Sequence, residues 1–228
     1  MLTPAETEAL LLSLRVALWC VVATLPLGIG VAWLLARREF YGKNLLNGIL
    51  HLPLVLPPVA VGYLLLLTFG RNGPAGAWLY ETFGFSVAFT WQGAVIASAV
   101  MAFPLMVRAI RLSLEGVDRR LEGAARTLGS GPVRIFMTIT LPLIAPGILT
   151  GSILAFARSL GEFGATITFV SNIAGETRTL PLALYTMAQT PDGESGALRL
   201  VALSAALAMM ALLASEMTAG RLRRQLGA

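Results

Sequence analysis

Two charged residues, Arg158 and Glu162, stand four positions apart inside a strongly apolar stretch of the sequence. Charged side chains at membrane depth are energetically costly and usually mark a functional site. On a helix, this spacing would let the two side chains form an ion pair, which favours a structural role inside the protein. Gly161 and Gly164 would also allow the backbone to unwind and offer N–H groups to an anion. We therefore keep two interpretations, a structural pair and a contact with a transported anion.

Residues 118–142 form the long polar interruption of this apolar chain, and their pattern predicts a short helix, a turn and a second helix. Asp118 is a suitable N-cap because its carboxylate can accept a hydrogen bond from a backbone N–H of the first turn. Gly129 stands where the end of a helix favours the left-handed conformation. Pro132 then suits the first turn of the second helix.

The first helix of this stretch is expected to present a surface that a partner could approach closely. Ala124, Ala125 and Gly129 are small, and Glu122 and Arg126 stand four apart on the polar side as a favourable pair. Such a surface has too little area to form a core by itself. We interpret it as a docking surface.

These residues resemble the cytoplasmic coupling loop of ABC importer permeases, whose pattern is EAA-x3-G-x9-I-x-L-P. The run 124–129 matches the first part, and Ile139, Leu141 and Pro142 fall at the expected offset. Gly123 occupies the family's Glu position, and the acid stands one residue earlier. The resemblance implies that a separate ATPase subunit docks on the coupling residues Glu122, Ala124, Ala125, Arg126, Gly129, Leu141 and Pro142.

The composition is that of an integral membrane protein. Of 228 residues, 56% are hydrophobic and 13% are charged, with a mean hydropathy of +0.76, whereas soluble domains carry about 25% charged residues. The net charge of +5 fits a positive-inside bias better than binding to nucleic acid. A single cysteine and a single histidine leave little for disulfides, metal sites or metal catalysis. The chain also lacks a GxxxxGK[ST] loop, so we expect it neither to bind ATP–Mg nor to hydrolyse ATP itself.

Apolar runs predict five membrane spans, near residues 10–36, 47–69, 93–110, 141–160 and 198–219. The acidic N-terminus is unlike a signal peptide, so we expect the first run to stay as an anchor. Residues 70–90 are expected to form a loop. The run 161–192 is too polar and glycine-rich for a regular span, and we interpret it as an irregular segment, re-entrant or not, with a short helix at 180–188.

The second span contains Pro53, Pro57 and Pro58, so its first half cannot be a regular helix. Broken backbone inside a membrane is tolerated where it is buried in protein or faces a water-filled path. Pro57 and Pro58 could therefore line a translocation route, or they could form a kink packed against neighbouring helices.

The charges of the loops predict the orientation. With the N-terminus outside and five spans, three loop arginines lie outside: Arg71, Arg178 and Arg199. Twelve basic residues lie inside: Arg37, Arg38, Lys43, Arg108, Arg111, Arg119, Arg120, Arg126, Arg134, Arg221, Arg223 and Arg224. This bias places the C-terminus and a coupling loop of about 108–140 in the cytoplasm.

A second resemblance covers residues 161–186. GEFGAT at 161–166, Phe169, Asn172 and the TLPLALYT run at 179–186 are similar to molybdate-type permeases. Sulfate-type permeases are similar in the same regions, so sulfate stays open as the solute. The resemblance suggests a translocation path near Pro57, Pro58, Arg158, Glu162, Gly164, Thr166 and Asn172.

The two resemblances together imply the assembly and the fold. We expect an all-α, type I ABC importer permease forming one domain over residues 1–228, with about five, or six, membrane-spanning helices, in the inner membrane of a bacterium. Two copies would form the path, two cytoplasmic ATPase subunits would carry ATP–Mg, and an extracytoplasmic protein would deliver molybdate or tungstate. An intramembrane protease is disfavoured because the chain has no GxSxG, no HExxH and no aspartate inside a span. A purely structural subunit would not need proline-broken spans beside a docking motif.

Overall fold

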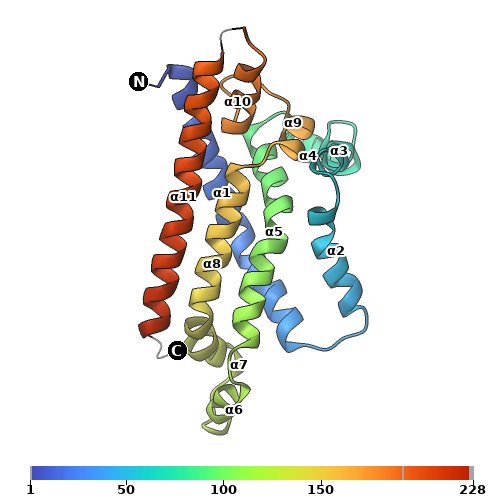
Figure 1. Ribbon diagram of the computed structural model, residues 1–228. Coiled ribbons are helices and arrows are strands. Elements are labelled where there is room, and N and C mark those ends of the chain that lie inside the picture. The colour runs from blue at the N-terminus through green and yellow to red at the C-terminus, as the bar shows by residue number, and fades with distance from the viewer. Residues whose placement is uncertain (1, 192, 226–228) are drawn as a thin grey trace.

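The computed structural model describes residues 2–191 and 193–225, and within them every regular element is helical (Figure 1). The elements in chain order are α1 (Pro4–Arg37), α2 (Lys43–Val55), α3 (Pro58–Phe69), α4 (Pro74–Phe83), α5 (Trp91–Glu115), α6 (Arg119–Thr127), α7 (Pro132–Ile135), the π-helical turn η1 (Phe136–Thr140), α8 (Leu141–Leu160), α9 (Gly164–Val170), α10 (Leu180–Ala188) and α11 (Glu194–Gln225).

Four long apolar helices form the bundle: α1, α5, the continuous run Pro132–Leu160 and α11. Each is long and apolar enough to cross a bilayer, and counting α2 and α3 as one bent span brings the number to five. The prediction of about five spans is confirmed. The helices that form the bundle are longer than the apolar runs from which the spans were predicted. Helix α1 begins at Pro4 because Thr3 and Glu6 form a capping box, and α5 continues to Glu115, so the coupling loop begins later than residue 108.

Helix α5 lies at the centre and packs closely against α8. Gly147 and Gly151 of α8 face α5, where a Cβ on Gly147 would collide with Ser113 and one on Gly151 would lie 3.0 Å from the Met106 carbonyl oxygen. These small residues therefore allow the backbones of α5 and α8 to approach closely, as the spacing of the two glycines predicts.

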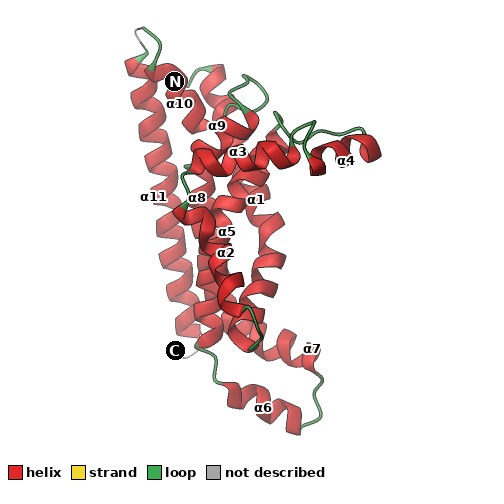
Figure 2. Ribbon diagram, turned by 90° about the vertical axis from the view of Figure 1, so that its right-hand side faces the viewer, coloured by secondary structure: helices red, strands yellow, loops and turns green. Residues whose placement is uncertain are grey.

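The proline-rich second span is broken into two helices, but its first half is the regular helix α2 with Pro53 inside it, so the prediction that this half cannot be a regular helix is wrong. Helix α2 rises beside the bundle and α3 turns by 112° to lie across its upper end (Figures 1 and 2). Pro57 and Pro58 form the corner, since Pro58 is the first residue of α3 and lacks the N–H that a continuous helix would need. Helix α3 then packs against α9, where a Cβ on Gly62 would lie 2.5 Å from the Ala165 carbonyl oxygen.

Two irregular segments at the same end contain more helix than the sequence indicates. The expected loop at 70–90 contains α4, which begins at Pro74 and ends at Phe83, followed by Gly84 with φ +66°. The segment after α8 contains α9 and then α10, whose bounds agree with the expected helix at 180–188. Both α9 and α10 lie at the end of the bundle opposite α6 (Figure 1), so this segment does not cross the bundle.

Candidate functional site

Helix α6 is a short helix with both ends fixed by local chemistry. The Asp118 carboxylate accepts a hydrogen bond of 2.9 Å from the Arg120 N–H. At the other end Gly129 has φ +81° and its N–H donates to the Arg126 carbonyl, while the Ser130 N–H donates to the Ala125 carbonyl. This pair of hydrogen bonds is a Schellman motif. The predicted helix, glycine turn and proline start are all confirmed.

Helix α6 stands clear of the bundle at the end where α1, α5 and α8 meet the loops (Figure 2). Ala125 is buried, whereas Ala124 and Arg126 on the same helix are exposed. Leu128 is 85% exposed, and Leu121 is exposed too. A helix this short is marginal in water without packing, so α6 depends on its anchor to the bundle.

Glu122 provides that anchor. Its Oε1 atom lies 3.0 Å from Nη2 of Arg37 at the end of α1, and accepts a 2.9 Å hydrogen bond from the hydroxyl of Thr140. The expected pairing of Glu122 with Arg126 is therefore wrong. The partners come from elsewhere in the chain because α6 folds back under α1 and η1, and Arg37 and Thr140 are functional candidates that the sequence reasoning missed.

Leu141 and Pro142 lie where the segment containing α6 and α7 enters the bundle. The Leu141 N–H donates to the Phe136 carbonyl, five residues earlier, which defines the π-helical turn η1. Pro142 follows directly and has no N–H, so it interrupts the backbone hydrogen bonds of this continuous helix next to the π turn. Such π turns inside helices often occur at functional sites, so this part of the motif forms a joint within one long helix.

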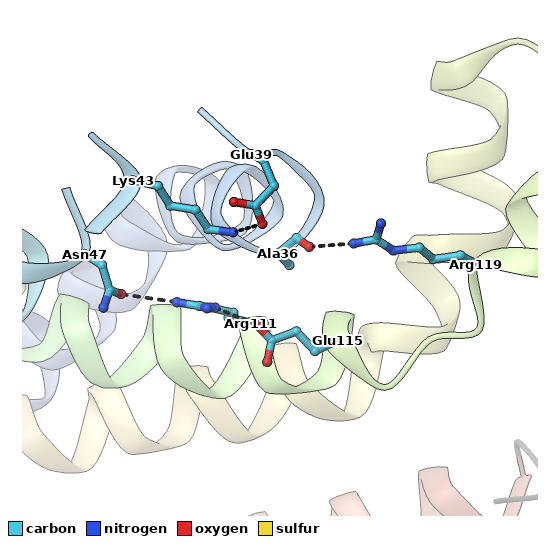
Figure 3. A network of polar contacts seen from close by, with 7 residues as sticks. All are labelled: Ala36, Glu39, Lys43, Asn47, Arg111, Glu115 and Arg119. Carbon is cyan, nitrogen blue, oxygen red and sulfur yellow. Dashed lines mark hydrogen bonds and ion pairs between the residues drawn. The ribbon is translucent and has the colours of Figure 1, made fainter. Parts of the chain in front are cut away.

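Further polar contacts tie the loop ends together around α6 (Figure 3). Arg119 donates to the Ala36 carbonyl at 3.2 Å, and Arg111 bridges Asn47 at 3.2 Å and Glu115 at 2.7 Å. In the α1–α2 loop, the hydrogen bond and charge of Lys43, 2.7 Å away, lower the pKa of the Glu39 carboxyl. These contacts join α1, α2, α5 and α6 at one end of the bundle.

The pair Arg158 and Glu162 lies near the opposite end, and the structure favours its structural interpretation. Arg158 Nη1 lies 2.7 Å from Glu162 Oε2, and Glu162 is 2% exposed. The other carboxylate oxygen accepts a 2.8 Å hydrogen bond from the Ala165 N–H. The Glu162 carboxylate therefore binds at the start of α9. This is the glycine-rich backbone that was expected to offer its N–H groups to a transported anion.

Most of the other path candidates gather around this pair. A Cβ on Gly164 would lie 2.7 Å from the Cβ of Pro58, so the corner next to Pro57 packs directly on the start of α9. Thr166 is buried and donates to the Phe163 carbonyl at 2.8 Å.

Asn172 is held separately, in the connection from α9 to α10. Its amide donates to the Thr186 hydroxyl at 2.7 Å and accepts from Arg178 Nε at 2.8 Å. The first hydrogen bond joins the connection to α10 and the second joins two residues within the connection, so Asn172 helps to fix its shape.

The described chain thus combines a broken membrane span, a short helix outside the bundle and a π-helical turn in the helix that follows. Residues 25–221 match the family described as "Binding-protein-dependent transport system inner membrane component", and the chain belongs to this family. It is 64% identical over 226 residues to the "Molybdenum transport system permease protein ModB" of Escherichia coli K12, covering 99% of both chains. It is 59% identical to the protein of the same description from Haemophilus influenzae, covering 97% of both.

Solved structures show the same fold. The chain superposes with a TM-score of 0.76 on a bacterial ABC transporter involved in the import of alginate, covering 96% of this chain and 80% of that one at 16% identity. The score against the MetNI methionine ABC transporter in inward-facing form is 0.67, with 96% and 94% covered and 16% identity. The fold is that of type I ABC importer permeases.

Proposed function

We propose that this chain is the translocation subunit of an ATP-driven importer for molybdate, working as a homodimer. The observation that carries the proposal is α6, a capped helix held to the bundle by Glu122 with Leu121 and Leu128 exposed to solvent. Exposed apolar side chains on a short helix beside basic residues mark a surface for another protein. Two ATPase subunits, each carrying ATP–Mg, would each dock on one such helix.

The mechanism follows from how α6 is held. A movement of a docked ATPase would pull on α6, and α6 is bonded to α1 through Arg37 and to η1 through Thr140. ATP binding would thus favour one of two arrangements of the bundle by its differential affinity for them. The path would open outward to accept the oxyanion from an extracytoplasmic binding protein, and hydrolysis would reset it.

Molybdate is proposed because relatives described as molybdenum transport permeases match almost the whole chain. Sulfate is the second candidate, because the chain is also 36% identical over 170 residues to a probable sulfate transport permease of Helicosporidium. The path needs only weak contacts with the anion, since tight binding there would slow its release.

The test is uptake of radiolabelled molybdate into proteoliposomes that contain the permease, its ATPase and its binding protein. We expect uptake that requires internal ATP and that tungstate inhibits, while equimolar sulfate leaves it unchanged. Stronger inhibition by sulfate than by tungstate would assign the solute to sulfate. No ATP-dependent uptake of either anion would reject the proposal.

The orientation needs a separate measurement. We propose that the N-terminus lies outside and that α6 and the C-terminus lie in the cytoplasm, on the basis of the basic residues around α6. A single cysteine at position 126, in a chain whose Cys20 is replaced by Ser, should react with an impermeant maleimide in inside-out vesicles and not in right-side-out cells. Reaction in intact cells would place α6 outside, where no cytoplasmic ATPase could reach it.

A further inference from the structure

A cavity of about 810 Å³ lies between the end of α1, helix α6 and the joint formed by α7 and η1. Ligand pockets in proteins typically have volumes of about 300–1,000 Å³. The cavity lies on the side of α6 that faces the bundle, and the proposed transport function assigns it no role.

The cavity has a strongly basic end. Four arginines line it there, and Glu122 is the single acid of its lining. Glu122 is already bound to Arg37, and Arg119 donates to the Ala36 carbonyl. Arg38 lies with its guanidinium carbon 5.5 Å from the centre of the Trp33 ring. For the side chain of Arg126, the fourth of them, the described part of the chain provides no ion pair or hydrogen bond.

Arg37 is the most buried of these four arginines. Its side chain is 7% exposed, yet its Nε–H has no hydrogen-bond partner among the described residues. A buried N–H of a charged group without an acceptor costs free energy. Because the Nε atom itself is buried, Arg37 contributes positive charge to this end of the cavity, not an open hydrogen-bond donor.

The other end of the cavity is apolar. Pro26, Ile29 and Trp33 line it from α1, and Phe136 lines it from η1. From Pro26 to Arg37 the helix rises by about 16 Å at 1.5 Å per residue. Leu27 on the same helix is 66% exposed, as expected for a surface that meets lipid.

We propose that this cavity binds one anionic phospholipid, with its phosphate among the arginines at the end of α1 and an acyl chain along Ile29 and Trp33. The ligand must be amphiphilic because the cavity joins a basic end to an apolar end within a membrane-spanning helix. Basic residues just beyond the end of a span attract the anionic lipids of the cytoplasmic leaflet. The proposal does not depend on which solute the permease carries.

The experiment uses the full-length chain purified in detergent and depleted of lipid. Native mass spectrometry measures binding of phosphatidylglycerol and of phosphatidylcholine with the same acyl chains. We expect phosphatidylglycerol to bind at least fivefold more tightly. The double variant Arg38→Gln/Arg119→Gln should weaken this binding by about 25-fold, taking about fivefold for each basic residue near the membrane surface.

Two matched variants separate charge from shape. Arg120→Gln/Arg134→Gln removes the same charge from exposed positions outside the cavity and should retain the binding. Gly30 lines the apolar end, and a Cβ there would meet nothing within 4 Å beyond its own helix. Gly30→Leu should therefore fold normally and still reduce phosphatidylglycerol binding, because its side chain fills the groove.

Four results would overturn the proposal. Equal binding of the two lipids would show that the headgroup charge is not recognised. An equal loss of phosphatidylglycerol binding in the Arg120→Gln/Arg134→Gln control would show that the lipid does not bind in this cavity. Displacement of the lipid by glycerol 3-phosphate at a similar concentration would identify a soluble phosphate as the ligand. A photo-crosslinker at position 29 that joined a second protein chain instead of lipid would show that this face is a protein interface.

Discussion

Replacing Glu122 by Gln should loosen α6 from the bundle and uncouple transport from ATP hydrolysis. The pair with Arg37 spans 3.0 Å, and the two side chains are 7% and 15% exposed. At this distance the attraction is about 5 kcal/mol with an effective dielectric constant of 20, and desolvation offsets part of it. Removing one partner of a fully buried pair costs about 3–5 kcal/mol.

Gln retains an oxygen that can accept from Arg37 and from the Thr140 hydroxyl, so only part of this free energy is lost. We expect a loss of about 2 kcal/mol, below the range for fully buried pairs. Since each 1.4 kcal/mol is a factor of ten, the population with α6 detached should rise by about 30-fold.

Hydrogen exchange of the α6 amides, measured on the permease in lipid nanodiscs, reports that population. Exchange of residues 119–128 should accelerate by up to the same factor, while exchange in α5 stays unchanged. In proteoliposomes with the ATPase, the number of anions carried per ATP should fall. Glu115→Gln is the matched control, because its ion pair with Arg111 is more exposed, at 30% and 43%, and such surface pairs contribute about 0.3–0.5 kcal/mol. If α6 exchanged no faster in the Glu122 variant than in the control, Glu122 would not be the anchor.

Three further changes test other parts of the argument. Gly129→Ala should destabilise the end of α6 by about 1 kcal/mol, because φ is +81° there and L residues avoid this region. We expect normal membrane insertion and reduced coupled uptake. Wild-type uptake would contradict the prediction. Gly164→Ala should lower the thermal unfolding temperature, because its Cβ would lie 2.7 Å from Pro58; an unchanged temperature would mean that α3 and α9 separate easily. Glu162→Gln leaves Arg158 without its counter-ion inside the bundle, so the unfolding temperature should fall more than uptake or basal ATPase activity changes; an unchanged unfolding temperature with altered uptake would instead assign the pair to the translocation path.

The parts of the fold that depend on local chemistry could be predicted from the sequence. The start of α6 at Asp118, the left-handed Gly129 and the helix start at Pro132 are each specified by one residue type in one position. The long spans follow from apolar length alone. Helix α4 was missed because the surrounding residues 70–90 are rich in glycine and aromatic side chains, although α4 itself contains a single glycine.

The contacts that join distant residues could not be predicted. Arg37 and Glu122 are 85 positions apart, and the nearer cation on the same helix, Arg126, is the simpler partner by spacing. Only the path of the chain, which returns α6 beneath the end of α1, decides between them. The same holds for Gly164, whose neighbour Pro58 belongs to a helix that turns by 112° to reach it.

The displacement of the acid by one residue from the family pattern explains both the anchor and the cavity. Successive residues on a helix point about 100° apart, so an acid at 122 and an acid at 123 cannot face the same partner. Glu122 pairs with Arg37 within the cavity lining, and Gly123 lines the same cavity at a point where a Cβ would meet nothing within 4 Å beyond its own helix. A carboxylate at position 123 would partly neutralise the arginines around it. Glycine there leaves the positive charge uncompensated and the space open, which is the condition that an anionic headgroup requires.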